Sequence, residues 1–560
     1  MGILLRSFIK LEGGSLKRFF DKLTKIPHAA QKEYLFQVLK RNRGTEYGHK
    51  YNFAKIRNEG DYQRDVPINR YQDLEPYIEK IINGGKNVLT AEIPFMFNLT
   101  SGSSDKPKFI PVTNTTKKRT ALLMRQWLYR TLLNHPSFLD KFNFTITSSA
   151  VEGKTQSGIP YGSASGLLYK NLPRIMRSSY VLPFIVSDIQ SYDLRYYIMA
   201  RLAFEKDVSV ICTPNPTTLM KLAEIGIQYQ REIIRSIQDG CLFTKLDFEI
   251  NINDSKIVDL INTSLIPNRP RAQFLSKVID NNNLLLPYYC WPSLRLLGCW
   301  LGGSIGCQVD KLSTYYGNVA KRDIGYLASE GSFTLPYEDF TPSGILALQN
   351  NYYEFIPEEL ASNTNPKVLL GHELEIGKNY KVILTNESGL YRYDINDTVR
   401  VEKYYNQTPV LAFIRKTNDM LNITGEKVHV NQLIMTFQKI EKKFNMEIRQ
   451  FRVISNLSHV RYDIFLELGR DVAKEMLMNS VLPAIDSILA ESNIEYAQKR
   501  KSKRLNSPCL HIMDPSWEAN VRKKLIETGK RDIQYKWQSI SSEFLEIDKE
   551  YVKYAIDCKG

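Results

Sequence analysis

The chain has 560 residues, of which 43% are hydrophobic and 24% are charged. This length exceeds what one hydrophobic core usually organises, so we expect at least two domains, and the composition excludes a disordered or fibrous protein. A formal net charge of +15 indicates anionic partners, a requirement that nucleic acid, phospholipid and small anionic substrates would all satisfy.

The seven cysteines include no CxxC pair. An odd number with this spacing argues against a secreted disulfide framework and against a zinc ribbon, so we predict reduced thiols and a cytoplasmic location. The apolar run in MGILLRSFIKLEGG is too short for a signal peptide. The most apolar long window, NLLLPYYCWPSLRLLGCWLGGSIGC, is interrupted by prolines, glycines and Arg295, which disfavours a membrane helix.

Helical periodicity dominates the first ninety residues, notably in SLKRFFDKLTKI and PHAAQKEYLFQVLKRNRG. Two short strand-like runs then flank the polar stretch FNLTSGSSDKPKFIPVT. The next segment predicts a helix that is capped at Thr113 to Thr115 and stops near Pro136. Further along, RYYIMARLAFEKD is followed by the strand-like VSVIC and by a helix with Asn215 and Pro216 at its start.

This alternation predicts an α/β fold, with a large N-terminal α/β domain over residues 1–412 and a smaller α+β domain over residues 413–560. NYKVILTN is a predicted strand of the first domain. In the second domain we expect a helix from Val430 to Phe444, strands in RQFRVI and YDIFLEL, and a helix in VAKEMLMNSVLPAIDSILAES. The basic run QKRKSKR is expected to be a solvated loop, because it has no interleaved aromatic residues.

The segment TSGSSDKPK concentrates groups that bind phosphate. Gly102 permits unusual backbone angles, and Lys106 and Lys108 add positive charge. Hydroxyl donors come from Thr100, Ser101, Ser103 and Ser104. The spacing differs from GxxxxGK[ST], which disfavours a P-loop nucleotidase. A polar β-hairpin without a ligand is the alternative interpretation of the segment.

The same segment resembles the phosphate-binding loop of the adenylate-forming superfamily, [ST]-S-G-[ST]-[ST]-G-x-P-K, with Asp105 in place of the second glycine. Within that superfamily, the following KFIPVT resembles the acyl acid amido synthetases, the Gretchen Hagen three type, which conjugate auxin and jasmonate to amino acids in plants and have bacterial relatives. Further similar stretches occur in the family's order: CWLGGS, DIGYLASEG, NYYEFIP, LYRYDINDTVRV, FIRKTNDMLNITGEKV and GKRDIQYKW. They span nearly the whole chain, so it is identified as a bacterial-like member of this family.

The resemblance implies that the larger domain is an adenylate-forming domain that binds ATP and the acid, and that the smaller domain is a mobile lid. It places Ser329 at the nucleotide, Glu330 on Mg²⁺, and Tyr326 against the adenine, which it would stack on or border. Asp397 would bind the ribose by accepting two hydroxyl groups. Residues alone leave alternatives open, namely a helix start or a turn for the Ser-Glu pair and an Asx-turn that closes the strand for Asp397. Asn396 stands where the family usually has glycine.

The resemblance also implies roles for three basic residues. Arg415 is similar to the arginine at the domain junction, and Lys427 to a lysine near the nucleotide phosphates. Lys536 is similar to the lysine that the smaller domain delivers to the reacting carboxylate. His372 and His429 are interpreted as structural, since no GxSxG elbow and no zinc spacing accompanies them.

The implied reaction joins a small carboxylic acid to an amine, usually an amino acid, through an acyl adenylate. ATP and Mg²⁺ are the implied cofactors, and we expect a monomer that binds neither nucleic acid nor membrane. Two alternatives are an adenylate-forming enzyme that passes the acyl group to a thiol and a catalytically silent relative. Asp105 bears on the silent alternative, because a carboxylate that faces a triphosphate is repelled by it. In an active enzyme, Asp105 would have to point away, pair with Lys106 or Lys108, or bind Mg²⁺.

Overall fold

The chain divides into two compact units, Met1–Ile414 and Arg415–Gly560. The computed structural model describes residues 2–100, 108–146, 150–163, 166, 169, 177–244, 248, 250–303, 309–361, 363, 366–416, 420–424, 426–527, 537–541 and 546–557. The division predicted after residue 412, with an ATP- and acid-binding role for the first part and a lid role for the second, stays a prediction.

The chain begins with the predicted helices. They are α1 (Gly2–Leu23), α2 (Pro27–Asn42), α3 (Glu46–Lys50), α4 (Glu59–Asp65) and α5 (Tyr71–Ile82), with a short 3-10 helix at Phe53–Lys55. Apolar faces of α2 and α5 pack into a large core of the first unit, for example through Leu35 and Leu74. These helices thereby cover part of the main sheet of this unit.

The main sheet of the first unit has six strands in the order β11-β12-β16-β15-β14-β13. Their bounds are β11 (Thr334–Leu335), β12 (Ser343–Leu346), β13 (Tyr352–Pro357), β14 (Asn379–Thr385), β15 (Tyr393–Tyr405) and β16 (Thr408–Lys416). β14 contains the predicted strand NYKVILTN, and β13 and β15 pair with it on either side in antiparallel register. Short 3-10 helices at Glu358–Leu360 and Gly371–Glu373 lie between β13 and β14.

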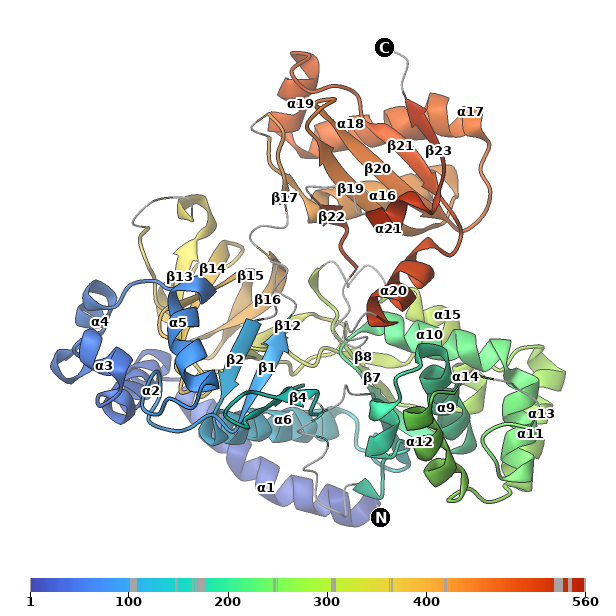
Figure 1. Cartoon of the computed structure of the whole chain (residues 1–560), viewed down its shortest axis with the longest axis horizontal. Helices are drawn as coiled ribbons and strands as arrows, with labels where there is room; N and C mark the ends of the chain where they lie inside the picture. The colour runs from blue at the N-terminus through green and yellow to red at the C-terminus, as the bar shows by residue number, and fades with distance from the viewer. Residues whose placement is uncertain are drawn as a thin grey trace. The chain divides into compact units, whose positions relative to one another are not determined.

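A second sheet has the order β2-β1-β5-β4, built from β1 (Met96–Thr100), β2 (Lys108–Val112), β4 (Gly153–Lys154) and β5 (Pro160–Gly162). Helix α6 (Asn114–Asn134) follows β2 directly and lies alongside α1 below this sheet (Figure 1). Thr113 caps α6 by accepting a hydrogen bond from the Thr116 N–H, as the sequence predicts. The cap therefore marks the point where β2 ends and α6 begins.

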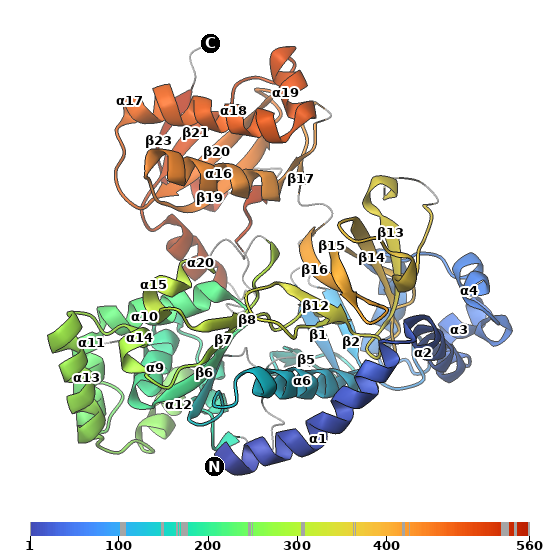
Figure 2. The same ribbon diagram turned by 180° about the vertical axis from the view of Figure 1, so that it is seen from behind.

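A third sheet is parallel, in the order β3-β6-β7-β8, from β3 (Phe142–Thr145), β6 (Val208–Cys212), β7 (Leu296–Gly298) and β8 (Ala320–Arg322). Helices gather around it (Figure 2): α9 (Tyr192–Glu205), α10 (Pro216–Gln228), α11 (Gln230–Asp239), α12 (Ile252–Asn262), α13 (Arg269–Asn282), α14 (Pro287–Cys290) and α15 (Leu312–Tyr316), with a 3-10 turn at Phe184–Asp188. Asn215 caps α10 with Pro216 at its first position, which confirms the predicted start.

The second unit is an α+β unit around the sheet β22-β19-β20-β21-β23. Its strands are β17 (Met420–Leu421), β18 (Val428–His429), β19 (Ile448–Asn456), β20 (Arg461–Leu468), β21 (Cys509–Met513), β22 (Ile540–Ser541) and β23 (Val552–Asp557), of which β17 and β18 form a separate pair. Its helices are α16 (Val430–Phe444), α17 (Lys474–Met476), α18 (Leu482–Ser492), α19 (Ile494–Lys501), α20 (Trp517–Glu527) and α21 (Glu546–Lys549), with a π-helical turn at Leu477–Val481.

Helices α16 and α18 pack on one face of this sheet through one apolar core, and α20 packs on the sheet through a separate small core that includes Phe465 and Trp517. The prediction of a loop for QKRKSKR is wrong in part, because α19 continues to Lys501. Arg500 is held there by Asp486 (2.6 Å), so a tertiary ion pair extends the helix into the basic run. Among the described residues, no helix is both long and apolar enough to cross a bilayer.

Candidate active site

The hairpin β1–β2 carries the hydroxyl-rich segment between its strands. Thr100 and Lys108 are paired at the end of the ladder, so the segment leaves and re-enters the sheet at one point. Lys108 is half-buried, and its ammonium lies 5.4 Å from the centre of the Tyr71 ring. The Tyr71 hydroxyl accepts a hydrogen bond from the Phe109 N–H (3.0 Å). The remaining loop positions, namely Ser101, Gly102, Ser103, Ser104, Asp105 and Lys106, lie outside the described residues.

Ser329 and Glu330 form the two-residue turn of a small hairpin, between β9 (Leu327–Ala328) and β10 (Gly331–Ser332). The turn is held through its backbone: Asn98 of β1 donates its Nδ2–H to the Ser329 carbonyl (3.0 Å), and Asn386 donates to the Glu330 carbonyl (2.9 Å). Both side chains are half-buried. The structure therefore brings the second predicted motif against the root of the hydroxyl-rich hairpin.

Tyr326 and Asp397 meet, although 71 residues separate them in the chain. The Tyr326 hydroxyl donates to Asp397 Oδ2 at 2.5 Å, and both residues are buried. Phe333 stacks on the Tyr326 ring with a centroid distance of 4.2 Å, and the Phe413 ring lies 5.3 Å away. Burial, followed by the negative charge of Asp397, raises the pKa of Tyr326 well above its usual value, so the hydroxyl stays a donor.

A β-bulge positions Asp397. Lys381 pairs with Thr398 and Ile383 with Asp394, so one residue of β14 faces three residues of β15. Asn396 lies in this bulge with φ of +62°, a left-handed conformation that asparagine tolerates better than most residues. Lys381 binds Asp394 at 2.6 Å below the bulge, with both side chains nearly buried. Bulges commonly re-aim side chains beside active sites, and this one sets the position of Asp397.

Sequence reasoning assigned no role to Tyr393, although it lies within the third motif. Burial first, then the negative charges of Glu330 and nearby residues including Asp397, raise the pKa of its hydroxyl far above the usual value. Glu330 affects Tyr326 in the same direction. The carboxylates of the second and third motifs therefore act on the same two tyrosines. An aromatic residue inside the motif was the only signal that pointed to Tyr393.

Asp323, the first residue of DIGYLASEG, was also missed. Its side chain is buried at 3% exposure and accepts backbone hydrogen bonds from Leu301 (2.7 Å) and Gly325 (2.6 Å). Burial raises its pKa to about 7. Gly325, with φ of +103°, supplies the sharp turn that Tyr326 follows. Asp323 thus ties the CWLGGS segment to the strand end that presents Tyr326.

The predicted basic residues are distributed over both units. Arg415 is buried at the end of β16 and is the first residue of the second unit. Lys427 is exposed in the second unit, between β17 and β18, and its carbonyl accepts a hydrogen bond from Asn493 (2.8 Å). Lys536 lies outside the described residues. His372 stacks on His28 with a centroid distance of 4.5 Å, and His429 precedes α16 as its N-cap residue, which fits their structural interpretation.

The first unit offers groups that suit a nucleotide with a hard cation. Oxygen donors dominate the turn and the bulge, and Mg²⁺ prefers oxygen ligands. Asn98 Oδ1 is a buried acceptor with no hydrogen-bond partner within the part of the chain that the structure describes. It belongs to the same side chain that holds the Ser329 turn. Among the described residues, the oxygens of Asn98, Glu330 and Asp397 are thus of the chemical type that Mg²⁺ and the hydroxyl groups of a nucleotide would require.

Family models match most of the chain. They are the GH3 family N-terminal domain over residues 16–321, the GH3 family central domain over residues 344–416 and the GH3 family C-terminal domain over residues 429–543. Similar curated proteins include jasmonoyl--L-amino acid synthetase GH3.5 of Oryza sativa subsp. japonica, 26% identical over 92% of this chain and 93% of the relative. Indole-3-acetic acid-amido synthetase GH3.2 of Arabidopsis thaliana is 25% identical over 88% of this chain and 94% of its own length.

Solved structures share the fold. The GH3.15 acyl acid amido synthetase superposes with a TM-score of 0.84 at 19% identity, covering 98% of both chains. A 2-hydroxyisobutyryl-CoA ligase in complex with 2-HIB-AMP gives a TM-score of 0.52 at 11% identity, covering 92% of this chain and 89% of its own. These similarities confirm the predicted α/β class, with a large N-terminal and a smaller C-terminal domain.

Proposed function

This chain belongs to the GH3 family, and from that membership we propose that it is an ATP-dependent ligase that adenylates a small carboxylic acid and transfers the acyl group to an amino acid. The predicted family is confirmed, and the predicted reaction class is the one that the relatives' names give. The observation that carries the proposal is the convergence of three motifs in the first unit: Asn98 binds the Ser329 turn, and Tyr326 binds Asp397.

We assign the adenosine end of ATP to Asp397 and Tyr326. A carboxylate offers about four acceptor positions, so Asp397 can accept the Tyr326 hydroxyl and still accept ribose hydroxyl groups. Tyr326 is buried between aromatic neighbours, which favours bordering the adenine over stacking on it. Its main task is then to orient the carboxylate.

We assign the phosphate end of ATP to the β1–β2 hairpin and to the turn at Ser329 and Glu330. Lys108, Thr100 and the loop hydroxyls of Ser101, Ser103 and Ser104, with the backbone at Gly102, supply donors for phosphate oxygens, beside Ser329. Glu330 would hold Mg²⁺, and the bound ion would neutralise charge on the triphosphate. Arg415 and Lys427 are proposed to add positive charge at the nucleotide, and Lys536 at the reacting carboxylate.

The proposed reaction has two steps, adenylation of the acid and transfer of the acyl group to the amine. An oxygen of the acid bonds to the α-phosphorus of ATP, and the bond from that phosphorus to pyrophosphate breaks. The neutral amine then attacks the activated carbonyl carbon, the bond to AMP breaks, and one amine proton passes to solvent. Positive charge from Lys108 and the other basic residues stabilises the transition state of the first step, because negative charge accumulates around the α-phosphate.

Substrate identity is a further proposal. The relatives are named for jasmonate and indole-3-acetic acid, so we propose a small acid of comparable size and an amino acid as the pair of substrates. The net charge of +15 suits such anions. We propose a monomer that acts in the cytoplasm, without nucleic acid or membrane as partner.

The test is product formation. Purified protein is incubated with Mg·ATP, a panel of carboxylic acids and a mixture of amino acids, and conjugates and AMP are measured by mass spectrometry. The proposal predicts one amide and one AMP per ATP consumed for at least one acid. Thioester formation with coenzyme A in place of the amide would favour the thiol-transfer alternative. If ATP does not bind, the silent relative is favoured.

A further inference from the structure

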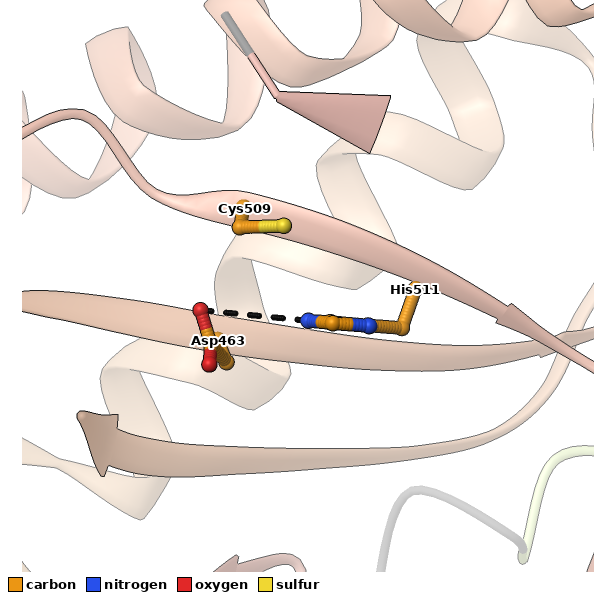
Figure 3. Close-up of side chains that lie close together, drawn as sticks. All are labelled: Asp463, Cys509 and His511. Carbon is orange, nitrogen blue, oxygen red and sulfur yellow. Dashed lines mark ion pairs between the residues drawn. The ribbon is translucent and has the colours of Figure 1, made fainter. Parts of the chain in front are cut away.

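Three side chains of different chemistry meet on the sheet of the second unit, outside the motifs described above. They are Asp463 of β20 and Cys509 and His511 of β21 (Figure 3). One donor atom from each residue lies within 4.8 Å of the others. His511 Nε2 lies 3.8 Å from Asp463 Oδ1, beyond hydrogen-bond distance.

The strand register of the sheet brings these three side chains together. β20 and β21 run parallel, with Asp463 beside Cys509 and Phe465 beside His511. Since side chains alternate between the faces of a strand, residues two apart share a face. Cys509 and His511 therefore share a face, and the Phe465 ring stacks under the His511 ring at 4.4 Å with an interplanar angle of 10°. The rigid sheet, rather than a loop, sets the cluster's geometry.

The surroundings fix the carboxylate, whereas the His511 Nε2 atom makes only the long 3.8 Å approach to Asp463 that Figure 3 marks as an ion pair. Asn456 donates to Asp463 Oδ2 (2.6 Å) and Arg461 donates to Oδ1 (2.9 Å). His511 Nε2 is buried and has no hydrogen-bond partner among the residues that the structure describes. A buried polar atom without a partner is costly, which points to a missing ligand at this nitrogen.

An open pocket of about 470 Å³ gives access to the cluster. Its lining includes the end of β19 and the residues that follow, at positions 455–458, together with Asp463 and His511. Cys509 itself is buried at 1% exposure. The pocket is lined by Asp463 and His511, so solvent comes close to two of the three side chains, while Cys509 lies buried beside them.

We propose that Asp463, Cys509 and His511 form a binding site for a zinc-like divalent ion. A thiolate, an imidazole and a carboxylate are the three protein ligand types of Zn²⁺, and three protein ligands with an open fourth position are typical of accessible zinc sites. With metal–ligand bonds of about 2.0–2.3 Å, tetrahedral donor atoms lie about 3.5 Å apart, so the cluster needs only a small contraction.

The neighbours of Asp463 suit this assignment. Carboxylates that bind a metal usually accept hydrogen bonds from neighbouring side chains, and Asp463 accepts them from Asn456 and Arg461. Each of its carboxylate oxygens keeps a second lone pair for the ion. Binding displaces the Cys509 thiol proton to solvent, so a neutral thiol becomes a thiolate. The site is independent of the proposed ligase activity, because none of its residues belongs to the candidate active site.

The experiment uses the full-length protein, stripped with a chelator and titrated with Co²⁺ as a spectroscopic substitute for Zn²⁺. We expect one Co²⁺ per chain with a thiolate-to-cobalt charge-transfer band, and its displacement by Zn²⁺. Cys509→Ser removes the band, and His511→Gln weakens binding at least about tenfold. Asn456→Ala removes a hydrogen bond to the Asp463 carboxylate, and also those that Asn456 Oδ1 accepts from Ser458 and from the His459 N–H, and weakens binding by about 10- to 100-fold.

Matched controls are Cys241→Ser, a partly exposed thiol elsewhere, and His459→Gln, an exposed histidine close to the pocket. Both keep the band and the affinity. Circular dichroism establishes that each variant is folded, and the wild-type spectrum is decisive without any variant. Absence of a thiolate band in wild type, or an affinity that Cys509→Ser and His511→Gln leave unchanged, overturns the proposal.

Discussion

The Tyr326 hydroxyl donates a 2.5 Å hydrogen bond to Asp397 Oδ2, and this contact joins two motifs of the candidate active site. Tyr326→Phe removes the donor and leaves the buried carboxylate less well oriented. A hydrogen bond to a charged group contributes about 1.5–3 kcal/mol, so we expect the ATP dissociation constant to rise by about 10- to 100-fold, measured by equilibrium binding.

The matched control is Tyr197→Phe, which removes another buried hydroxyl, bonded to the Leu242 carbonyl. Tyr197→Phe should lose about 1 kcal/mol of unfolding free energy in urea, and Tyr326→Phe about 1.5–3 kcal/mol, because its hydroxyl binds a charged group. Equal ATP affinities for the two would mean that the Tyr326 hydroxyl only stabilises the fold.

The bulge at Asn396 makes a prediction about backbone geometry. Asn396→Gly tolerates φ of +62° and should bind ATP as the wild type does, whereas Asn396→Val should lower the free energy of unfolding by about 1–3 kcal/mol and weaken ATP binding. Urea denaturation and equilibrium binding measure the two effects. Normal ATP affinity in a folded Asn396→Val protein would show that the bulge does not position Asp397.

A substitution at Glu330 can remove the negative charge of its side chain while keeping the backbone contact that anchors its turn. That contact is the hydrogen bond from Asn386 to the Glu330 carbonyl. Glu330→Gln keeps this carbonyl, so the variant should remain folded. Adenylation should fall by about 100-fold or more, and saturation should require more Mg²⁺. Glu338→Gln, which removes a half-buried carboxylate paired with Lys403, should change neither the adenylation rate nor the Mg²⁺ requirement. Unaltered Mg²⁺ dependence in Glu330→Gln would remove this residue from the metal site.

Asp323 predicts a pH dependence of stability. Its pKa is raised from 3.8 to about 7 in the folded chain by burial. Between these values the native state holds a proton that the unfolded chain has released, so the free energy of unfolding decreases as the pH rises. The wild type should lose about 1 kcal/mol per pH unit more than Asp323→Asn from pH 5 to 7, and no more than it above that range. Urea denaturation across this range measures both slopes, and parallel slopes would contradict the assignment.

Local signals predicted much of the fold. Thr113 and Asn215 are capping residues whose effect is confined to one helix turn, and the α16 bounds Val430–Phe444 match those expected from periodicity. The family motifs also predicted which stretches would converge. The basic run after α18 was predicted less well, because its helical end depends on Asp486, a residue of another helix.

Contacts set by strand register could not be predicted. The bulge in β15 depends on its pairing with β14, and the cluster of Asp463, Cys509 and His511 depends on the parallel alignment of β20 with β21. Neither pairing has a local sequence signal, and the ligands of the cluster do not follow a zinc motif in spacing. Site roles for the loop residues 101–107 and for Lys536 stay predictions, since these positions lie outside the described residues.

The most direct test of the ligase assignment is acid-dependent exchange of labelled pyrophosphate into ATP, with Asp397→Ala as the control. The account predicts exchange that requires Mg²⁺ and one class of carboxylic acid, and that falls by at least about tenfold in Asp397→Ala. Exchange that is equal in wild type and Asp397→Ala would contradict the site. Lack of both exchange and ATP binding in the wild type would contradict the ligase itself.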